Sequence, residues 1–253
     1  MFSVFDEIGF NEEHHKYTFE SAPHITPLSV SGIIGQYKKP FDSDFFAQRK
    51  ADSLGIDKQV ILDQWKNAAD TGCDKGTVSH LYLETLLESE QFVYPTKYNH
   101  VKDLFLALKP QLDKFMAENK LEHVKSEIVM GCKELGITGT LDELFRDPRN
   151  GNYYIFDWKT NKAMNRESRY YLTGKLYDLD SSEISTYSLQ QELYKYLLEK
   201  YTDIKVKACY LVWFNANNES YEIIKTKNVD KYMKIILNDL HETKENRISL
   251  TNK

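Results

Sequence analysis

The chain has 253 residues, 41% of them hydrophobic, which is enough for one domain with a substantial core, so we expect a single domain over residues 1–253. No apolar run approaches the length needed to cross a bilayer, and the first residues lack the basic and apolar segments of a signal peptide, so no membrane partner is expected. The net charge of −5 at pH 7 excludes a uniformly basic surface, so any contact with nucleic acid must come from a local concentration of cations.

Three cysteines, Cys73, Cys132 and Cys209, are widely spaced. Their odd number and their spacing indicate a reducing compartment rather than a disulfide scaffold. We expect the cytoplasm of a bacterial or phage-infected cell, or the mitochondrial matrix or nucleus of a eukaryotic one. The chain lacks a Gly-x-x-x-x-Gly-Lys-Ser/Thr loop, so no nucleotide cofactor is expected.

The first half of the chain is predicted to be mainly helical. Residues 57–69 have helical spacing, with Val60, Ile61 and Trp65 facing inward. A second helix is predicted from Thr77 to residue 89, and a third over residues 101–118. On the second helix, His80 and Glu84 are four residues apart and share one face. A neutral imidazole there can bind a divalent ion, and the carboxylate can orient the imidazole or bind nearby.

A meander of three strands follows, at residues 127–132, 136–147 and 153–160. The Asn150-Gly151 dipeptide predicts a tight turn between the last two strands. Asp157 and Lys159 are two residues apart and point to the same face, and folding the hairpin back can bring Asp142 beside them. Two carboxylates and a lysine on an apolar sheet are costly without a cation. The alternative is an exposed hairpin with these charges on its solvent side.

The rest of the chain is predicted to contain one helix, two strands and a final helix, at residues 188–200, 206–215, 220–226 and 229–242. This order gives an α/β fold with a mixed central sheet flanked by helices on both faces, after a helical N-terminal part. On the first of these helices, Gln190 and Tyr194 lie on the face beside the apolar stripe. Gln190 can hold a lysine or a phosphate oxygen, and Tyr194 can stack or hydrogen-bond at a DNA backbone.

The segment from Lys159 to Lys175 is basic and aromatic, with Glu167 as its only acidic residue. We expect it to bind a strand of DNA that passes the site. The alternative is a solvated connecting loop. The residues that we assign to DNA binding are Lys162, Arg166, Arg169, Tyr170 and Lys175.

These motifs, in this order, resemble the PD-(D/E)XK nuclease superfamily, and specifically its RecB-like exonuclease branch. The matching elements are Gly-Thr-x-x-His-x-x-x-Glu at residues 76–84, Gly-x-x-Asp at 139–142, Asp-x-Lys at 157–159 and Gln-x-x-x-Tyr at 190–194. The segment at residues 25–34 is similar to the N-terminal "Val-Thr-x-Ile" segment of phage and mitochondrial members. The resemblance places the nuclease core at about residues 75–226.

The resemblance implies a DNA nuclease that hydrolyses phosphodiester bonds with one or two Mg²⁺ or Mn²⁺ ions, and with partner proteins of replication, recombination or repair. Asp142, Asp157 and Lys159 would be catalytic, and His80, Asp142, Asp157 and the backbone carbonyl of Trp158 would bind metal. Glu127 matches an acidic position of the branch and would have a supporting role, as would Glu84, Gln190 and Tyr194. Some relatives hold an iron–sulfur cluster on four cysteines, which three cysteines cannot supply.

Two other functions compete with a DNA exonuclease. A site-specific endonuclease would share the same core, but the sequence has no evident added recognition domain. A non-catalytic DNA-binding protein of the same fold would be expected to lose an aspartate or the lysine, and Asp142, Asp157 and Lys159 are all present.

Overall fold

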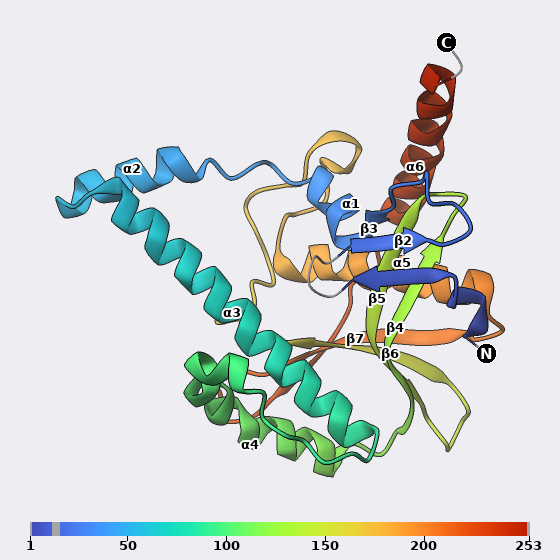
Figure 1. Cartoon of the computed structure of the whole chain (residues 1–253), viewed down its shortest axis with the longest axis horizontal. Coiled ribbons are helices and arrows are strands. Elements are labelled where there is room, and N and C mark those ends of the chain that lie inside the picture. The colour runs from blue at the N-terminus through green and yellow to red at the C-terminus, as the bar shows by residue number, and fades with distance from the viewer. Residues whose placement is uncertain (1, 12–15, 252–253) are drawn as a thin grey trace.

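A computed structural model describes residues 2–11 and 16–251 of the chain, with side chains up to residue 242 (Figure 1). The fold is α/β, with a mixed sheet that carries helices on both faces, as the sequence predicts. The strands are β1 (Ile8–Asn11), β2 (Lys16–Phe19), β3 (Leu28–Ser29), β4 (Glu122–Cys132), β5 (Ile137–Arg146), β6 (Tyr153–Lys159), β7 (Val206–Trp213) and β8 (Glu222–Lys225). The helices are α1 (Val30–Gln36), α2 (Ser43–Leu54), α3 (Lys58–Leu87), α4 (Lys102–Glu118), α5 (Glu183–Tyr201) and α6 (Asp230–Thr251), and short 3₁₀ turns occur at Ser3–Phe5, Thr96–Val101 and Gly174–Leu176.

The main sheet has the order β4-β5-β6-β7-β8, and β3 joins it beside the first residues of β5. Strands β4, β5 and β6 form the expected antiparallel meander, whereas β6 and β7 are parallel. A parallel pair needs a crossover, and α5 lies in the connection between β6 and β7. The β5–β6 turn confirms the prediction from the Asn-Gly dipeptide, because Gly151 has φ +73° and its N–H donates to the carbonyl of Asp147 at 2.7 Å.

Each face of the sheet has its own apolar layer. One layer joins the sheet to α1, α5 and α6, with Ile155 of β6 and Leu193 of α5 among its fully buried side chains. The other layer joins the sheet to α3 and α4. Phe156 and Trp158 both belong to this second layer, as their spacing predicts, and Trp158 packs edge-on against Phe115 of α4 with ring centroids 5.1 Å apart.

Helix α3 differs from the prediction, because residues 57–69 and 77–89 belong to one continuous helix of 30 residues. Thr77 does not cap a helix; its hydroxyl donates to the carbonyl of Cys73, one turn earlier. The two glycines of this region, Gly72 and Gly76, lie inside the helix, where each costs only about 1 kcal/mol relative to alanine, and packing along α2 and α4 outweighs that cost. Val60 was expected to face inward but is 44% exposed.

The N-terminal region is also not purely helical. β1 and β2 pair antiparallel, with Phe10 stacked on Tyr17 at 4.6 Å between ring centroids. The Tyr17 hydroxyl is 2.9 Å from the Thr140 hydroxyl of β5, so this hairpin is attached to the main sheet. The segment that resembles the N-terminal family motif forms β3 and α1, and Ser29 caps α1 by accepting a hydrogen bond from the N–H of Gly32.

Candidate active site

Two aspartates face each other where β5 and β6 separate. The antiparallel pairing of these strands ends at Glu143 and Phe156, and the next residues in the same register are Asp142 and Asp157. The backbone N–H of Trp158 donates to Asp142 Oδ2 at 2.9 Å instead of to a carbonyl of β5. The end of strand pairing therefore leaves room for side chains in the plane of the sheet, and Asp142 occupies part of it.

Glu127 approaches the same point from β4. It lies opposite Asp142, between the paired residues Ser126 and Ile128, and it has φ +45°. This left-handed conformation is unusual for a residue with a side chain and costs on the order of 1 kcal/mol or more, and such residues cluster at functional sites. The sequence identified Glu127 as a supporting residue, but the distortion of β4 that brings it to Asp142 was not foreseen.

His80 of α3 lies between these carboxylates and β6. Its Nε2 is 3.1 Å from the carbonyl oxygen of Trp158, which can only accept, so Nε2 must carry the proton. Its Nδ1 faces Asp142 Oδ2 at 3.6 Å and Glu127 Oε1 at 3.8 Å. Burial alone would lower the pKa of His80, but Asp142 and Glu127 raise it to about 9.

Asp157 and Lys159 form an ion pair on the face of β6 that is covered by α5. The side-chain amide of Gln191 donates to Asp157 Oδ1 at 2.8 Å, and the Lys159 ammonium lies 4.5 Å from the ring centroid of Tyr187. Burial would lower the pKa of Lys159, but Asp157 and Asp142 raise it above its ordinary value. The lysine therefore stays protonated and can only donate.

Two carboxylates of the site, those of Asp142 and Asp157, are largely buried beside Lys159 and His80, and the third, that of Glu127, is partly exposed. Burial raises the pKa of Asp157 to about 6, because the opposing effect of Lys159 is smaller and Asp142 adds repulsion. Burial also raises the pKa of Asp142, despite the nearby His80 and Lys159. A bound cation would reverse these shifts, and carboxylate oxygens with one imidazole are a donor set that suits Mg²⁺ or Mn²⁺.

His80, Glu127 and Asp142 have ligand atoms within 4.8 Å of one another and could hold such an ion. This group differs from the ligand set implied by the sequence, because it contains Glu127 and lacks Asp157. The carbonyl of Trp158 is adjacent and faces His80. The group does not include Glu84, which lies one turn beyond His80 on α3.

Gln190 and Tyr194 are in contact on α5. The Gln190 amide donates to the Tyr194 hydroxyl at 3.1 Å, and the Tyr194 ring is buried against Gly139 of β5. Burial, together with Asp142 and Asp157, raises the pKa of Tyr194, so its hydroxyl stays protonated. Tyr194 thus packs beside the aspartates and is buried, whereas the sequence placed it beside the apolar stripe, in a position to contact a DNA backbone.

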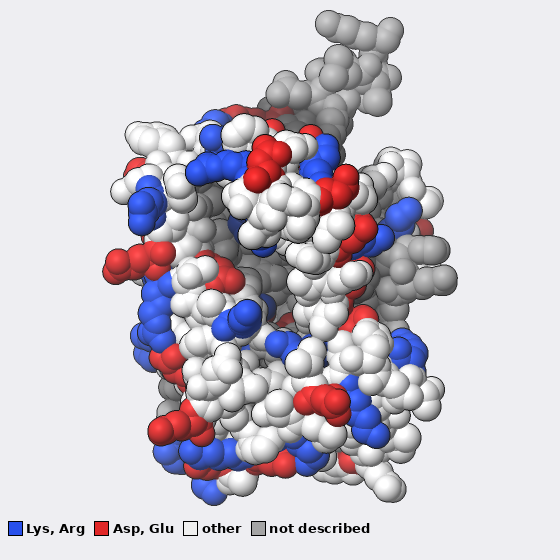
Figure 2. All heavy atoms as spheres, turned by 90° about the vertical axis from the view of Figure 1, so that its left-hand side faces the viewer, with Lys and Arg blue, Asp and Glu red and all other residues white. Residues whose placement is uncertain are grey.

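The expected DNA-binding segment has more countercharge than its own sequence suggests. Arg166 pairs with Glu222 of β8, and Lys175 pairs with Asp239 and Glu242 of α6. The prediction that only Glu167 opposes these cations is therefore wrong. Lys162, Arg169 and Tyr170 are exposed and form no ion pair with any described residue. Figure 2 shows basic and acidic groups interspersed over one whole face of the molecule.

Sequence reasoning missed two residues of the site, Gln191 and Tyr187. Gln191 is buried and holds Asp157, although Gln190 beside it was the residue chosen. Tyr187 lies one turn before Gln191 on the same face of α5 and contacts Lys159. The helical spacing of Tyr187 and Gln191 was visible in the sequence, but which face of α5 meets β6 depends on how the helix docks.

No protein-family model matches this chain, and no curated protein matches it either. Among solved structures, the crystal structure of SSO0001 aligns with 66% of this chain and 72% of its own chain, at 12% sequence identity and a TM-score of 0.30. In the described part of the chain, no helix is both long enough and apolar enough to cross a membrane.

Proposed function

We propose that this chain is a metal-dependent DNA nuclease of the PD-(D/E)XK type, and specifically an exonuclease of the RecB-like branch. The observation that supports it best is the convergence of Asp142, Asp157 and Lys159 at the end of the β5–β6 pairing, with His80 beside them. Buried carboxylates with raised pKa values favour a bound cation, and a buried lysine that stays charged favours an anionic substrate.

His80, Glu127 and Asp142 would hold the metal ion, and Asp157, opposite Asp142 in the strand register, would add negative charge near it. A bound Mg²⁺ or Mn²⁺ would supply positive charge at the scissile phosphate and make a nearby water more acidic. Lys159 would donate a hydrogen bond to that water or to a phosphate oxygen. Gln191 fixes the rotamer of Asp157, and Tyr187 covers Lys159, so both would position the reacting groups.

The reaction would add the oxygen of water to phosphorus and break the bond from phosphorus to the leaving sugar oxygen, which takes up a proton. Exonuclease action is preferred to site-specific cleavage because no described element presents an evident surface for reading base edges. The exposed Lys162, Arg169 and Tyr170 are suited to backbone and base contacts that do not depend on sequence.

The test is a cleavage assay with the metal-stripped full chain and end-labelled single-stranded and linear duplex DNA. Hydrolysis should appear on addition of Mg²⁺ or Mn²⁺ and stop when the metal is chelated. A chain that binds DNA but releases no nucleotides with either metal would instead be the non-catalytic member of this fold.

A further inference from the structure

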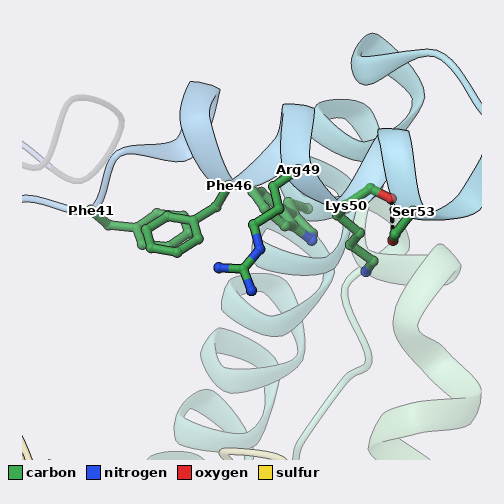
Figure 3. A pocket seen from close by; sticks show the side chains of 6 residues that line it. Phe41, Phe46, Arg49, Lys50 and Ser53 are labelled. Atoms are coloured by element: carbon green, nitrogen blue, oxygen red, sulfur yellow. Dashed lines mark hydrogen bonds between the residues drawn. The ribbon is translucent and has the colours of Figure 1, made fainter.

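An arm made of α2 and α3 projects from the body of the molecule (Figure 1). Phe41, Phe45 and Phe46 at this arm are exposed. Phe41 and Phe46 stack with ring centroids 5.1 Å apart and planes 4° from parallel, and they are 65% and 42% exposed. Phe41 also contacts Trp65 of α3 at 5.7 Å. With Arg49, Lys50 and Ser53 these rings line an open pocket of about 500 Å³, and we refer to the residues of this pocket as the arm patch (Figure 3).

The charge of the arm patch is positive. Arg49 and Lys50 line the pocket and form no ion pair with any described residue, and Lys50 lies 5.8 Å from the ring centroid of Trp65. Five acidic groups of the arm are engaged elsewhere: Asp42 caps α2, Asp57 caps α3, Asp44 pairs with Lys58, Asp52 accepts from Gln48 and Asp63 accepts from Gln59, whereas Asp70 of α3 is exposed. Flat apolar faces beside free cations are complementary to bases joined by phosphates.

The same helix connects the arm patch to the candidate active site. Trp65 and His80 both lie on α3, about 22 Å apart along its axis and within about 60° of the same face. The residues between them on that face are small, namely Ala69, Gly72, Cys73 and Gly76. Ala69 and Gly72 are exposed. A chain lying along this face would meet no large side chain of α3 from the patch to Gly72, and it would meet Thr160, just after β6, at Gly76, where a Cβ would lie 3.5 Å from the Thr160 hydroxyl.

Gly72 has no structural reason to be glycine. It lies inside a helix with an ordinary negative φ, and a Cβ placed there would meet no atom within 4 Å. Glycine is a poorer helix former than alanine at such a position. The absence of a side chain therefore benefits neither the helix nor the packing, and it leaves the face of α3 clear.

We propose that the arm patch binds single-stranded DNA at a distance from the cleavage site, with bases stacked on Phe41, Phe46 and Trp65 and phosphates on Arg49 and Lys50. This inference rests on the proposed nuclease function. The strand then runs along the small-residue face of α3 to His80. At about 3.4 Å per stacked nucleotide, the separation of Trp65 and His80 along the helix corresponds to about six nucleotides. The arm makes the enzyme sensitive to the length of its substrate.

The experiment compares a thymidine trinucleotide, which is too short to reach the arm from His80, with an oligothymidylate of roughly 20 nucleotides, longer than the site of one binding module. Phe46→Ala and Arg49→Ala are exposed changes, and both should raise the KM for the long strand about 5-fold or more. Neither change should alter kcat, or the rate on the trinucleotide. Without added metal, fluorescence anisotropy should show the same weakening for the long strand.

Gly72→Leu tests separately whether the strand runs along the small-residue face of α3. Leucine is the better helix former, so the melting temperature should rise, while the KM for the long strand should increase and the trinucleotide should be unaffected. Asn67→Leu, on the opposite side of α3, is the matched control and should not change the KM for either substrate.

Three outcomes would overturn the inference. If the variants cleave both the trinucleotide and the long oligothymidylate like the wild type, the arm does not bind DNA, although the proposed nuclease function still holds. Equal effects on both lengths would indicate a change in the site rather than in a remote contact. A dimer in sedimentation that Phe46→Ala converts to a monomer would assign the patch to self-association. Conversely, binding of the long strand that depends on Phe46, without cleavage by the wild type, would support the arm and refute the nuclease.

Discussion

At the scale of single residues, the site combines three carboxylates with one lysine and one histidine, and two of the carboxylates are largely buried. Asp142, Asp157 and Glu127 face only Lys159 and His80, and burial raises the pKa of both aspartates. Their placement follows from one feature, the end of pairing between β5 and β6, which exposes the N–H of Trp158 to Asp142. Each of these residues should therefore affect chemistry more than folding.

Asp157→Asn should reduce the rate of DNA hydrolysis by at least about 100-fold, because it removes a charge beside the reacting phosphate and the partner of Lys159. The volume is kept, so the far-ultraviolet circular dichroism spectrum should not change. Initial rates on end-labelled single strands measure the effect, and Asp63→Asn, on the exposed side of α3, serves as the control. Near-normal cleavage by Asp157→Asn would place the active site elsewhere.

His80→Ala should raise the Mn²⁺ concentration for half-maximal rate by about 10- to 100-fold, because Nδ1 is one of three ligand atoms that lie close together. Binding of DNA in the absence of metal should be unchanged. The measurement is a metal titration of the initial rate, with isothermal calorimetry of the metal alone. His100→Ala is the control and should behave like the wild type. His100 lies in the 3₁₀ turn Thr96–Val101 and contacts Asp74 of α3, the helix that carries His80. An identical titration for His80→Ala would make His80 a structural residue.

At the scale of elements, the site depends on how closely α5 approaches β5 and on how α5 begins. Gly139 permits the close approach, because a Cβ there would be 2.6 Å from the Tyr194 ring and 3.2 Å from Val30. The start of α5 is held by Ser182, whose hydroxyl accepts from the N–H of Ser185, and by Asp180. Both features control the position of Gln191 against Asp157.

Gly139→Ala should lower the free energy of unfolding by about 1–3 kcal/mol, because neither the tyrosine ring nor the β-branched valine can move away easily. The rate of hydrolysis should fall as well, since Tyr194 and Gln191 share α5. Urea denaturation and initial rates are the measurements. Gly35→Ala in α1 is the matched control: its Cβ would meet nothing within 4 Å, so stability should rise slightly. Equal stability of the two variants would contradict the close packing.

Asp180 should make the stability of the fold depend on pH. Burial would raise its pKa, but hydrogen bonds from Ser182, Ser185 and Lys227 lower it to about 2. A lowered carboxyl pKa stabilises the fold above the ordinary pKa of about 4, and this contribution is lost as the pH falls toward 2. Asp180→Asn should therefore be less stable than the wild type at pH 7, by about 1 kcal/mol after allowance for solvent screening, and equally stable near pH 2. Urea denaturation at both pH values decides this, and a difference that persists at pH 2 would rule out the ionised carboxylate as its source.

At the scale of the whole molecule, the proposed substrate is an end or a single strand rather than an intact duplex. The face drawn in Figure 2 has no large region of one sign. Cations without an ion pair to any described residue lie at separate places, among them Lys162 and Arg169 after β6 and Arg49 and Lys50 on the arm. Such a surface supports weak contacts along a backbone better than tight binding to a duplex site.

Linear DNA should accordingly be degraded at least about 10-fold faster than a covalently closed circle of the same sequence, because only the former offers an end to the site. The comparison uses Mg²⁺ at two salt concentrations, and the higher salt should slow the reaction on linear DNA. A nicked circle is the control for strand breaks in the preparation. Rapid cutting of the closed circle at one position would favour the site-specific endonuclease.

The sequence alone determined most elements of the second half of the chain and the local part of the site, but not the β1–β2 hairpin, α2 or the continuity of α3. The sequence pattern predicted β5, β6 and α4 closely, because burial of one face is encoded locally, whereas β4 begins at Glu122 and not at residue 127 as predicted. The Asn-Gly turn and the two-residue spacing of Asp157 and Lys159 likewise follow from backbone geometry.

Tertiary structure decided which distant groups share the site and which charges remain free. Glu127 joins His80 because β4 is distorted, and Gln191 rather than Gln190 meets Asp157 because of the rotation of α5 against the sheet. Arg166 and Lys175 form ion pairs with residues more than 50 positions later in the chain. Periodicity states that a face is buried, but the partner of each polar group depends on how helices and strands dock, and that information is not local.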